Sequence, residues 1–114
     1  SNALDALREK YEDIRLVYGI DMPYREDDLN SISWIAEERE QWSLLREIGD
    51  LSISIYPTSP FGYYNLGLAN EKSENYEKAL EFYKKGYSQL GNEIVNKNDF
   101  YRDIERMELK LKEN

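Results

Sequence analysis

Residues 60–91 read PFGYYNLGLANEKSENYEKALEFYKKGYSQLG, and this stretch decides the fold. Apolar residues recur in it at three- and four-residue spacing, which predicts two helices. The polar residues 73–75 between them predict a turn that brings the helices antiparallel. Small residues at Gly67 and Ala79 would let the two backbones approach closely, with aromatic side chains filling the space around them.

The order of aromatic and small residues in this stretch resembles the tetratricopeptide repeat (TPR). The matching positions are Tyr63, Leu66, Gly67, Tyr76, Ala79 and Tyr83. Asn70 stands where the family has an aromatic residue, and Gly86 stands where it has alanine. The resemblance implies a packed helix pair in a module that binds other proteins.

One repeat length upstream, the same register continues more weakly over residues 29–57. The matching residues there are Leu29, Ile32, Trp42, Leu45 and Pro57. Ser33 replaces the glycine, Ala36 an aromatic residue and Gly49 a large residue, so this repeat is degenerate. Stacked repeats need about three units to bury their cores, so the first and last helices are expected to cap the ends. The expected fold class is all-α: TPR-like antiparallel helix pairs in a short right-handed solenoid of about six helices.

Helical spacing of apolar residues and the capping signals between them predict the limits of these helices. The expected ranges are 4–18, 27–39, 42–56, 60–72, 76–90 and 99–112, with a polar connector at 92–98. Residues 51–55 alternate as in a strand, but the flanking pattern is helical and an isolated strand would lack a partner. Asp27 or Asp28 is expected to cap the second helix, and Ser59 followed by Pro60 to begin the fourth.

The apolar stripe of each helix indicates which side chains should face the core. Outside the clear repeat they are Leu4, Leu7, Tyr11, Ile14, Val17, Leu29, Ile32, Ile35, Ala36, Trp42, Leu45, Ile48, Ile55, Phe100, Ile104, Met107 and Leu111. Residues 1–3 (Ser-Asn-Ala) are typical of what remains after an expression tag is removed. Residues 4–114 are therefore expected to be a single domain taken from a longer protein.

Composition and charge argue against several classes of function. The net charge of −8 argues against nucleic-acid binding, which needs clustered Lys and Arg. No apolar run approaches the roughly 18 residues that span a membrane. The chain has no Cys and no His, so it lacks thiolate ligands, a cysteine nucleophile and the usual general base. We therefore expect no catalytic residue, no metal site and no cofactor.

In the repeat geometry, the first helix of each pair lines the concave face. The residues expected there are Asn30, Trp34, Glu37, Glu38, Phe61, Tyr64, Leu68, Glu71 and Lys72. Some TPR proteins bind C-terminal carboxylates through a cationic clamp on this face, but the matching residues here are aromatic and acidic. Trp34, Tyr64 and Leu68 could form an apolar binding strip. Three alternatives stay open for what covers it: the chain's own first helix, a missing domain or second copy in a homodimer, or a separate protein or peptide.

The acidic clusters 26–28 and 37–40 have a structural explanation. Carboxylates near a helix start are favoured by the helix dipole, and charge runs usually form solvated faces. No calcium-loop spacing is present. We therefore interpret both clusters as structural.

The layout of the chain carries a second, looser resemblance. A leading helix, the tripeptide Tyr18-Gly19-Ile20, a degenerate helix pair, Tyr56-Pro57 and a clear repeat follow one another. This order is similar to the C-terminal appendage of some bacterial esterase-like α/β hydrolases. It implies an alternative to the leading hypothesis of a non-catalytic interaction or scaffolding module. In the alternative, the chain is the accessory domain of a serine hydrolase whose catalytic domain lies upstream, and the compartment, periplasm or cytoplasm, is left open.

Overall fold

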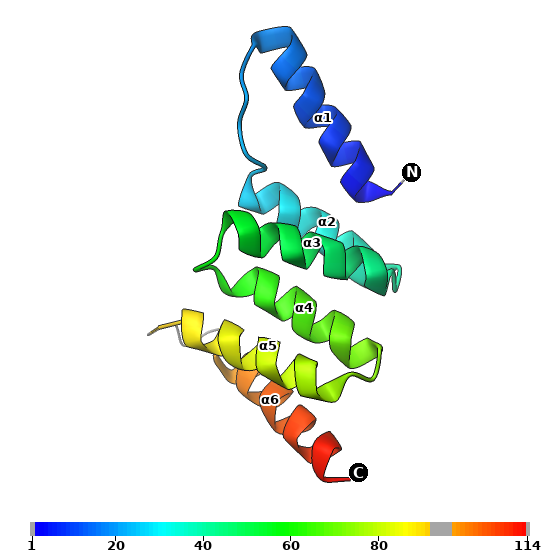
Figure 1. Ribbon diagram of the computed structural model, residues 1–114, viewed down its shortest axis with the longest axis vertical. Helices are drawn as coiled ribbons and strands as arrows, with labels where there is room; N and C mark the ends of the chain where they lie inside the picture. The colour runs from blue at the N-terminus through cyan, green and yellow to red at the C-terminus, as the bar shows by residue number, and fades with distance from the viewer. Residues whose placement is uncertain (1, 92–96, 114) are drawn as a thin grey trace.

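The computed structural model describes residues 2–91 and 97–113, which form α-helices and no strand. Successive helices pack against one another along a long axis of 54 Å, so the described chain is a short helical solenoid (Figure 1). The helices are α1 (Ala3–Tyr18), α2 (Glu26–Glu38), α3 (Trp42–Ile55), α4 (Pro60–Lys72), α5 (Tyr76–Gln89) and α6 (Lys97–Lys112). The expected all-α fold is confirmed, and each helix begins and ends within two residues of its expected limits. Residues 92–96 of the expected connector lie outside the described residues, and no described helix is long and apolar enough to cross a membrane.

Helices α4 and α5 pack closely where Gly67 faces Tyr83. A methyl group placed on Gly67 would lie 2.6 Å from two carbons of the Tyr83 ring, which is closer than real side chains pack. Ala79 and Tyr83 are fully buried on the facing side of α5. A ring of this size fits against α4 only because position 67 has no side chain.

Replacing Gly67 or Ala79 with Leu should overpack this helix pair. We expect each variant to lose about 1–3 kcal/mol of unfolding free energy, because the added atoms force neighbours out of place. Urea unfolding followed by circular dichroism measures the loss. Lys78→Leu, at an exposed position of α5, is the control and should stay within about 0.5 kcal/mol of the wild type. Unchanged stability in both buried variants would contradict the packing.

Small residues also bring α3 and α4 together. A methyl group on Gly49 would lie 2.9 Å from a Leu66 side-chain carbon, and one on Gly62 would lie 2.8 Å from Ile53. Ser52 lies in the same crossing, 5% exposed, and its hydroxyl has no hydrogen-bond partner among the described residues. The close packing of α3 on α4 therefore leaves the Ser52 hydroxyl buried without a hydrogen bond to any described residue.

Ser52→Ala should stabilise the protein. The substitution removes the desolvated hydroxyl without adding volume, and an unpaired buried polar group costs about 1–3 kcal/mol. We expect the midpoint of thermal unfolding to rise, as measured by calorimetry. A fall in the midpoint would show that the hydroxyl is paired in solution.

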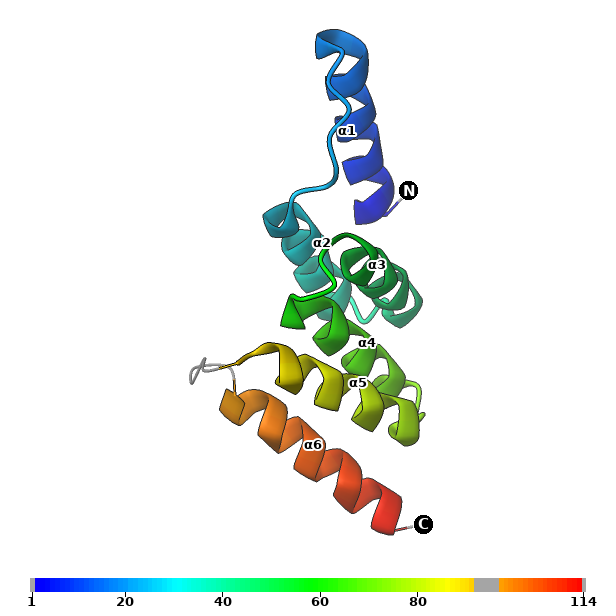
Figure 2. The ribbon, with the colours of Figure 1, turned by 60° about the vertical axis from the view of Figure 1, so that its left-hand side comes forward.

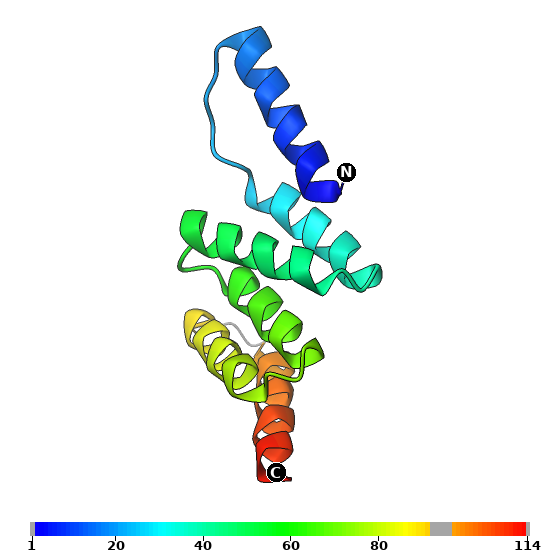
Figure 3. The same cartoon turned by 45° about the vertical axis from the view of Figure 1, so that its right-hand side comes forward.

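The N-terminal end of α1 packs on the solenoid, and its C-terminal end stands away (Figures 1 and 3). Leu4, Leu7 and Tyr11 are buried in the same core cluster as residues of α2 and α3. Val17 was expected to face the core, but it is 71% exposed, and the neighbouring Leu16 is 66% exposed. That expectation is wrong because α1 diverges from α2 beyond its third turn, and the extended segment 19–25 leads the chain back.

The expected cap of α2 is also wrong. Its N-cap residue is Arg25, which has no side-chain cap, and Asp27 and Asp28 lie within the first turn. The Asp28 carboxylate instead accepts a hydrogen bond of 2.6 Å from the Tyr11 hydroxyl, which ties α1 to α2. The expected start of α4 is confirmed, because the Ser59 side chain accepts from the Phe61 amide.

Two core clusters divide the solenoid and meet at α4. The first joins α1, α2, α3 and α4, and the second joins α5 with Phe100 and Met107 of α6. Tyr64 packs against both clusters. Phe100 lies against Gly86, where an added methyl group would clash with its ring. Helix α6 is thereby seated beside α5, as Figure 2 shows.

Candidate interaction groove

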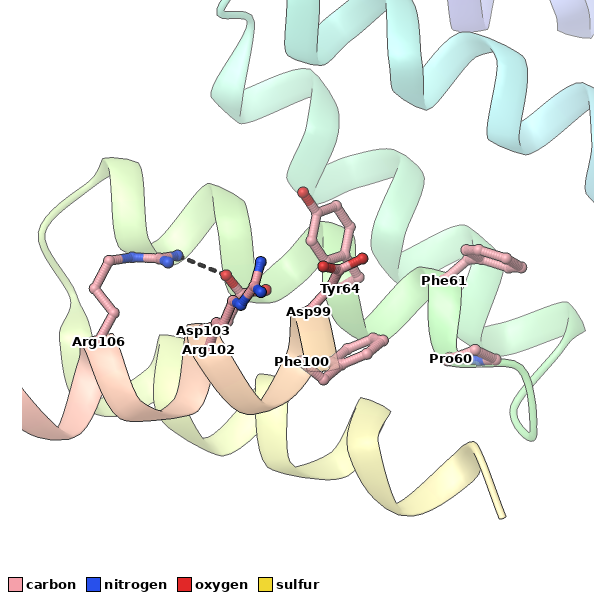
Figure 4. A pocket seen from close by; sticks show the side chains of 8 residues that line it. All are labelled: Pro60, Phe61, Tyr64, Asp99, Phe100, Arg102, Asp103 and Arg106. Atoms are coloured by element: carbon pink, nitrogen blue, oxygen red, sulfur yellow. Dashed lines mark hydrogen bonds and ion pairs between the residues drawn. The ribbon is translucent and has the colours of Figure 1, made fainter. Parts of the chain in front are cut away.

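A pocket of about 420 Å³ opens between α4 and α6 (Figure 4). Three aromatic side chains and four charged ones reach into it from the two helices. Its lining residues are Pro60, Phe61, Tyr64, Asp99, Phe100, Arg102, Asp103 and Arg106. We call this the α4–α6 pocket. Aromatic walls with a few polar groups are typical of surfaces that hold a ligand or a partner side chain.

A charged network fixes the wall that α6 contributes. The Arg106 guanidinium donates to both oxygens of Glu71 on α4, at 2.9 and 2.7 Å, and to Asp103 at 2.7 Å. The Tyr83 hydroxyl of α5 donates to Glu71 at 2.8 Å. A bidentate Arg–carboxylate pair has a defined orientation, so the network sets the position of α6 relative to α4.

The network shifts the pKa values of its members in the directions that ion pairing and burial require. Burial raises the pKa of Glu71, but hydrogen bonds from Arg106 and Tyr83 outweigh burial and lower it overall. The bond to Glu71 raises the pKa of Arg106 further above its usual range. Burial raises the pKa of Asp103, against the effect of Arg106. Glu71 and Arg106 are therefore both charged at neutral pH.

Tyr64 forms the inner side of the α4–α6 pocket. Its ring lies 6.0 Å from the Phe100 ring in an edge-on arrangement and 6.2 Å from the Tyr83 ring, measured between centroids. Burial and then the charges of Glu37, Asp103 and Glu71 raise the pKa of Tyr64 to about 12. No described residue forms a hydrogen bond with its hydroxyl, so that group can bond to a partner.

The raised pKa of Tyr64 makes stability depend on alkaline pH. The phenol ionises near pH 10.0 in the unfolded chain but only near 12 in the folded one. The contribution of Tyr64 to the unfolding free energy is therefore fully present below pH 10 and is lost as the pH rises toward 12. Between pH 9 and 11, the unfolding free energy measured in urea should fall less steeply for Tyr64→Phe than for the wild type. The two slopes should differ by less than about 1.4 kcal/mol per pH unit, the most that one titrating group can contribute. Parallel slopes in the two proteins would contradict the shift.

A second hollow, of about 560 Å³, lies on α2 around Trp34. Its lining residues are Asp27, Asn30, Ser31, Trp34 and Ile35, none of which lines the α4–α6 pocket. Trp34 is 64% exposed, an unusual position for so large an apolar side chain. We call this surface the α2 hollow.

Six of the nine residues expected on the concave face fall into three groups. Phe61 and Tyr64 line the α4–α6 pocket, and Trp34 and Asn30 line the α2 hollow. Glu37 is half-buried next to exposed Glu38 and carries a raised pKa, caused first by burial and then by the Glu38 charge.

The remaining three expected residues have other roles. Leu68 was expected on the exposed strip, but it is 8% exposed and belongs to the core, so it is not available to a partner. Glu71 is held in the network with Arg106. The Lys72 ammonium lies 5.8 Å from the centre of the Trp42 ring, at the start of α3.

Of the three open alternatives for what covers the strip, cover by the first helix does not hold at Trp34. Helix α1 leaves Trp34 exposed, whereas α6 packs on Tyr64 through Phe100. Sequence reasoning missed the α6 wall, from Asp99 to Arg106, because it treated this helix only as a cap. The signal was present in Gly86, whose missing side chain makes room for Phe100.

Comparison with known protein families, with curated proteins and with solved structures finds no match to this chain. Within residues 2–91 and 97–113, no three His, Cys, Asp or Glu side chains are grouped so that they could hold a metal ion.

Proposed function

We propose that the chain is a non-catalytic, TPR-like interaction module that binds a segment of a partner protein in the α4–α6 pocket. One observation carries the proposal: a pocket of about 420 Å³ is walled by Phe61, Tyr64 and Phe100 and held open by a fixed charged network. Such a pocket suits an apolar side chain, and buried aromatic anchors contribute most of the affinity in many interfaces. Trp34, in the α2 hollow, offers a second apolar contact on the same chain.

The absence of His and Cys from the sequence supports a binding role over a catalytic one. A hydrolysis assay with a generic ester substrate tests this part of the proposal. Activity that follows the protein through purification would overturn it.

Selection of random peptides displayed on phage, followed by NMR with ¹⁵N-labelled protein, tests the binding role. The selected peptide should shift amide signals of residues 60–64 and 99–106. Phe61→Ser should weaken binding at least roughly tenfold, because it removes an aromatic wall. Leu109→Ser is the matched control, since Leu109 is 61% exposed on α6 and lines a different surface. A peptide that shifts other signals, or a selection that yields none, would contradict the proposal.

A second candidate, the accessory domain of an esterase-like hydrolase, is favoured by the exposed end of α1. Leu16, Val17 and Tyr18 are 66%, 71% and 72% exposed there, and another domain could cover them. The natural reading frame tests this candidate directly. A frame without an α/β hydrolase domain would exclude it.

A further inference from the structure

The α4–α6 pocket has one guanidinium that no longer attracts an anion. Arg106 donates to Glu71 and to Asp103, so two carboxylates already neutralise its charge. The only other cation in the wall is Arg102, which is exposed and has no ion pair among the described residues.

Carboxylates near the pocket lack such partners. Neither Asp99 in the wall nor Glu37 on α2 forms an ion pair with a described residue. Glu37 is half-buried, and burial with the charge of Glu38 raises its pKa more than the charge of Lys72 lowers it. Three carboxylates, Glu37 among them, act on the Tyr64 hydroxyl against one guanidinium. The field over this side of the pocket is therefore negative.

Aromatic faces occur beside these carboxylates. Phe61 is 42% exposed, and the Tyr64 ring is partly exposed next to it. A cation over such a ring is attracted by its electron-rich face. In Figure 4 the Tyr64 ring reaches from α4 toward the side chains of α6, among them Asp99, whereas the Phe61 ring points away from that helix.

We propose that the partner segment carries a lysine or arginine beside an apolar side chain: the apolar side chain enters the α4–α6 pocket, and the cation meets Asp99, Glu37 and the Tyr64 face. The proposal rests on the binding function proposed above and names the chemistry of the partner. The net charge of −8 favours the approach of such a segment. The positive charge of Arg102 repels such a segment, and removing that charge should strengthen binding.

Three capped nine-residue peptides test the proposal. They share three phenylalanines and differ only at two intervening positions, which are both Lys, both Gln or both Glu. Binding is followed by NMR at low salt, on the whole chain, from the amide signals of residues 60–64 and 99–106. The Lys peptide should bind roughly tenfold more tightly than the Glu peptide, and the difference should shrink at 0.5 M salt.

Charge variants assign the preference to particular groups. Asp99→Asn and Glu37→Gln should each reduce the advantage of the Lys peptide severalfold, and Arg102→Gln should increase it. Asp50→Asn, on an exposed position of α3, is the control and should leave the advantage unchanged. These side chains are exposed or half-buried, so the variants should remain folded, which circular dichroism checks.

Each outcome bears on the two proposals differently. Equal or tighter binding of the Glu peptide in the pocket would overturn the inference and leave the binding function standing. Failure of the Lys peptide to shift the pocket signals at millimolar concentration would also overturn the inference. The binding function itself is tested by the phage selection, because its random peptides do not fix the charge of the partner segment in advance.

Discussion

Tyr83→Ala is expected to be the most damaging single substitution in the described chain, with a loss of about 3–5 kcal/mol of unfolding free energy. Tyr83 is fully buried, and its ring fills the space over Gly67. Its hydroxyl also donates to Glu71. Truncation leaves a cavity between α4 and α5 and removes a donor from the network that seats α6.

Tyr83→Phe separates the two contributions. It keeps the ring and removes only the hydrogen bond to a charged acceptor, which contributes about 1.5–3 kcal/mol. Tyr101→Ala, at a residue 54% exposed, is the matched control and should be nearly neutral. Urea unfolding of all three variants measures the differences. Equal losses for the Ala and Phe variants would show that the ring does not fill the core as described.

The helices could be predicted from the sequence because their signals are local. Periodic apolar residues, Ser59 before Pro60 and the turn at 73–75 each act within one or two turns of chain. The alternating residues 51–55 are helical because they continue a helix already begun at Trp42. Helix limits follow from such short-range chemistry, and they were predicted to within two residues.

The site depends on contacts between residues far apart in the sequence. Asp28 looked like a helix cap, but its carboxylate binds Tyr11, which is 17 positions away. Leu68 looked exposed from its register, yet it packs in the core shared with α2 and α3. The pairing of Arg106 with Glu71 spans 35 positions. No local pattern indicates which carboxylate a guanidinium will meet.

The α6 wall shows how one small residue could have corrected the prediction. Gly86 was recognised as a small residue in place of alanine, which leaves unfilled space on α5. Phe100 occupies that space, and its neighbours Asp99 and Asp103 are thereby brought to the pocket. A glycine facing outward from the last repeat indicates that another element packs on it.

Glu71→Ala is expected to have the second largest effect, about 2–3 kcal/mol of lost unfolding free energy. The Glu71 side chain is 14% exposed and accepts hydrogen bonds from Arg106 and from Tyr83. Its removal leaves a buried hydroxyl without a partner and unties α6 from α4.

The expected effect of Glu71 has a defined pH dependence. Its pKa is lowered in the folded chain, so its contribution is present above its unfolded pKa near 4.5 and is lost as the pH falls. Asp103, with a raised pKa, acts in the opposite sense, which leaves Glu71→Ala as the variant that isolates one group. The difference in unfolding free energy between wild type and Glu71→Ala should therefore narrow below pH 4.5.

Glu81→Ala provides the matched control for Glu71→Ala. Glu81 also pairs with a cation, Lys85 at 3.0 Å, but both side chains are more than half exposed. Surface pairs of this spacing contribute about 0.3–0.5 kcal/mol and weaken with salt. A double-mutant cycle of Glu71 and Arg106 in urea unfolding should give a larger coupling than one of Glu81 and Lys85. Equal couplings would mean that α6 is held by Phe100 and Met107 alone, and that the walls of the α4–α6 pocket owe their positions to packing rather than to charge.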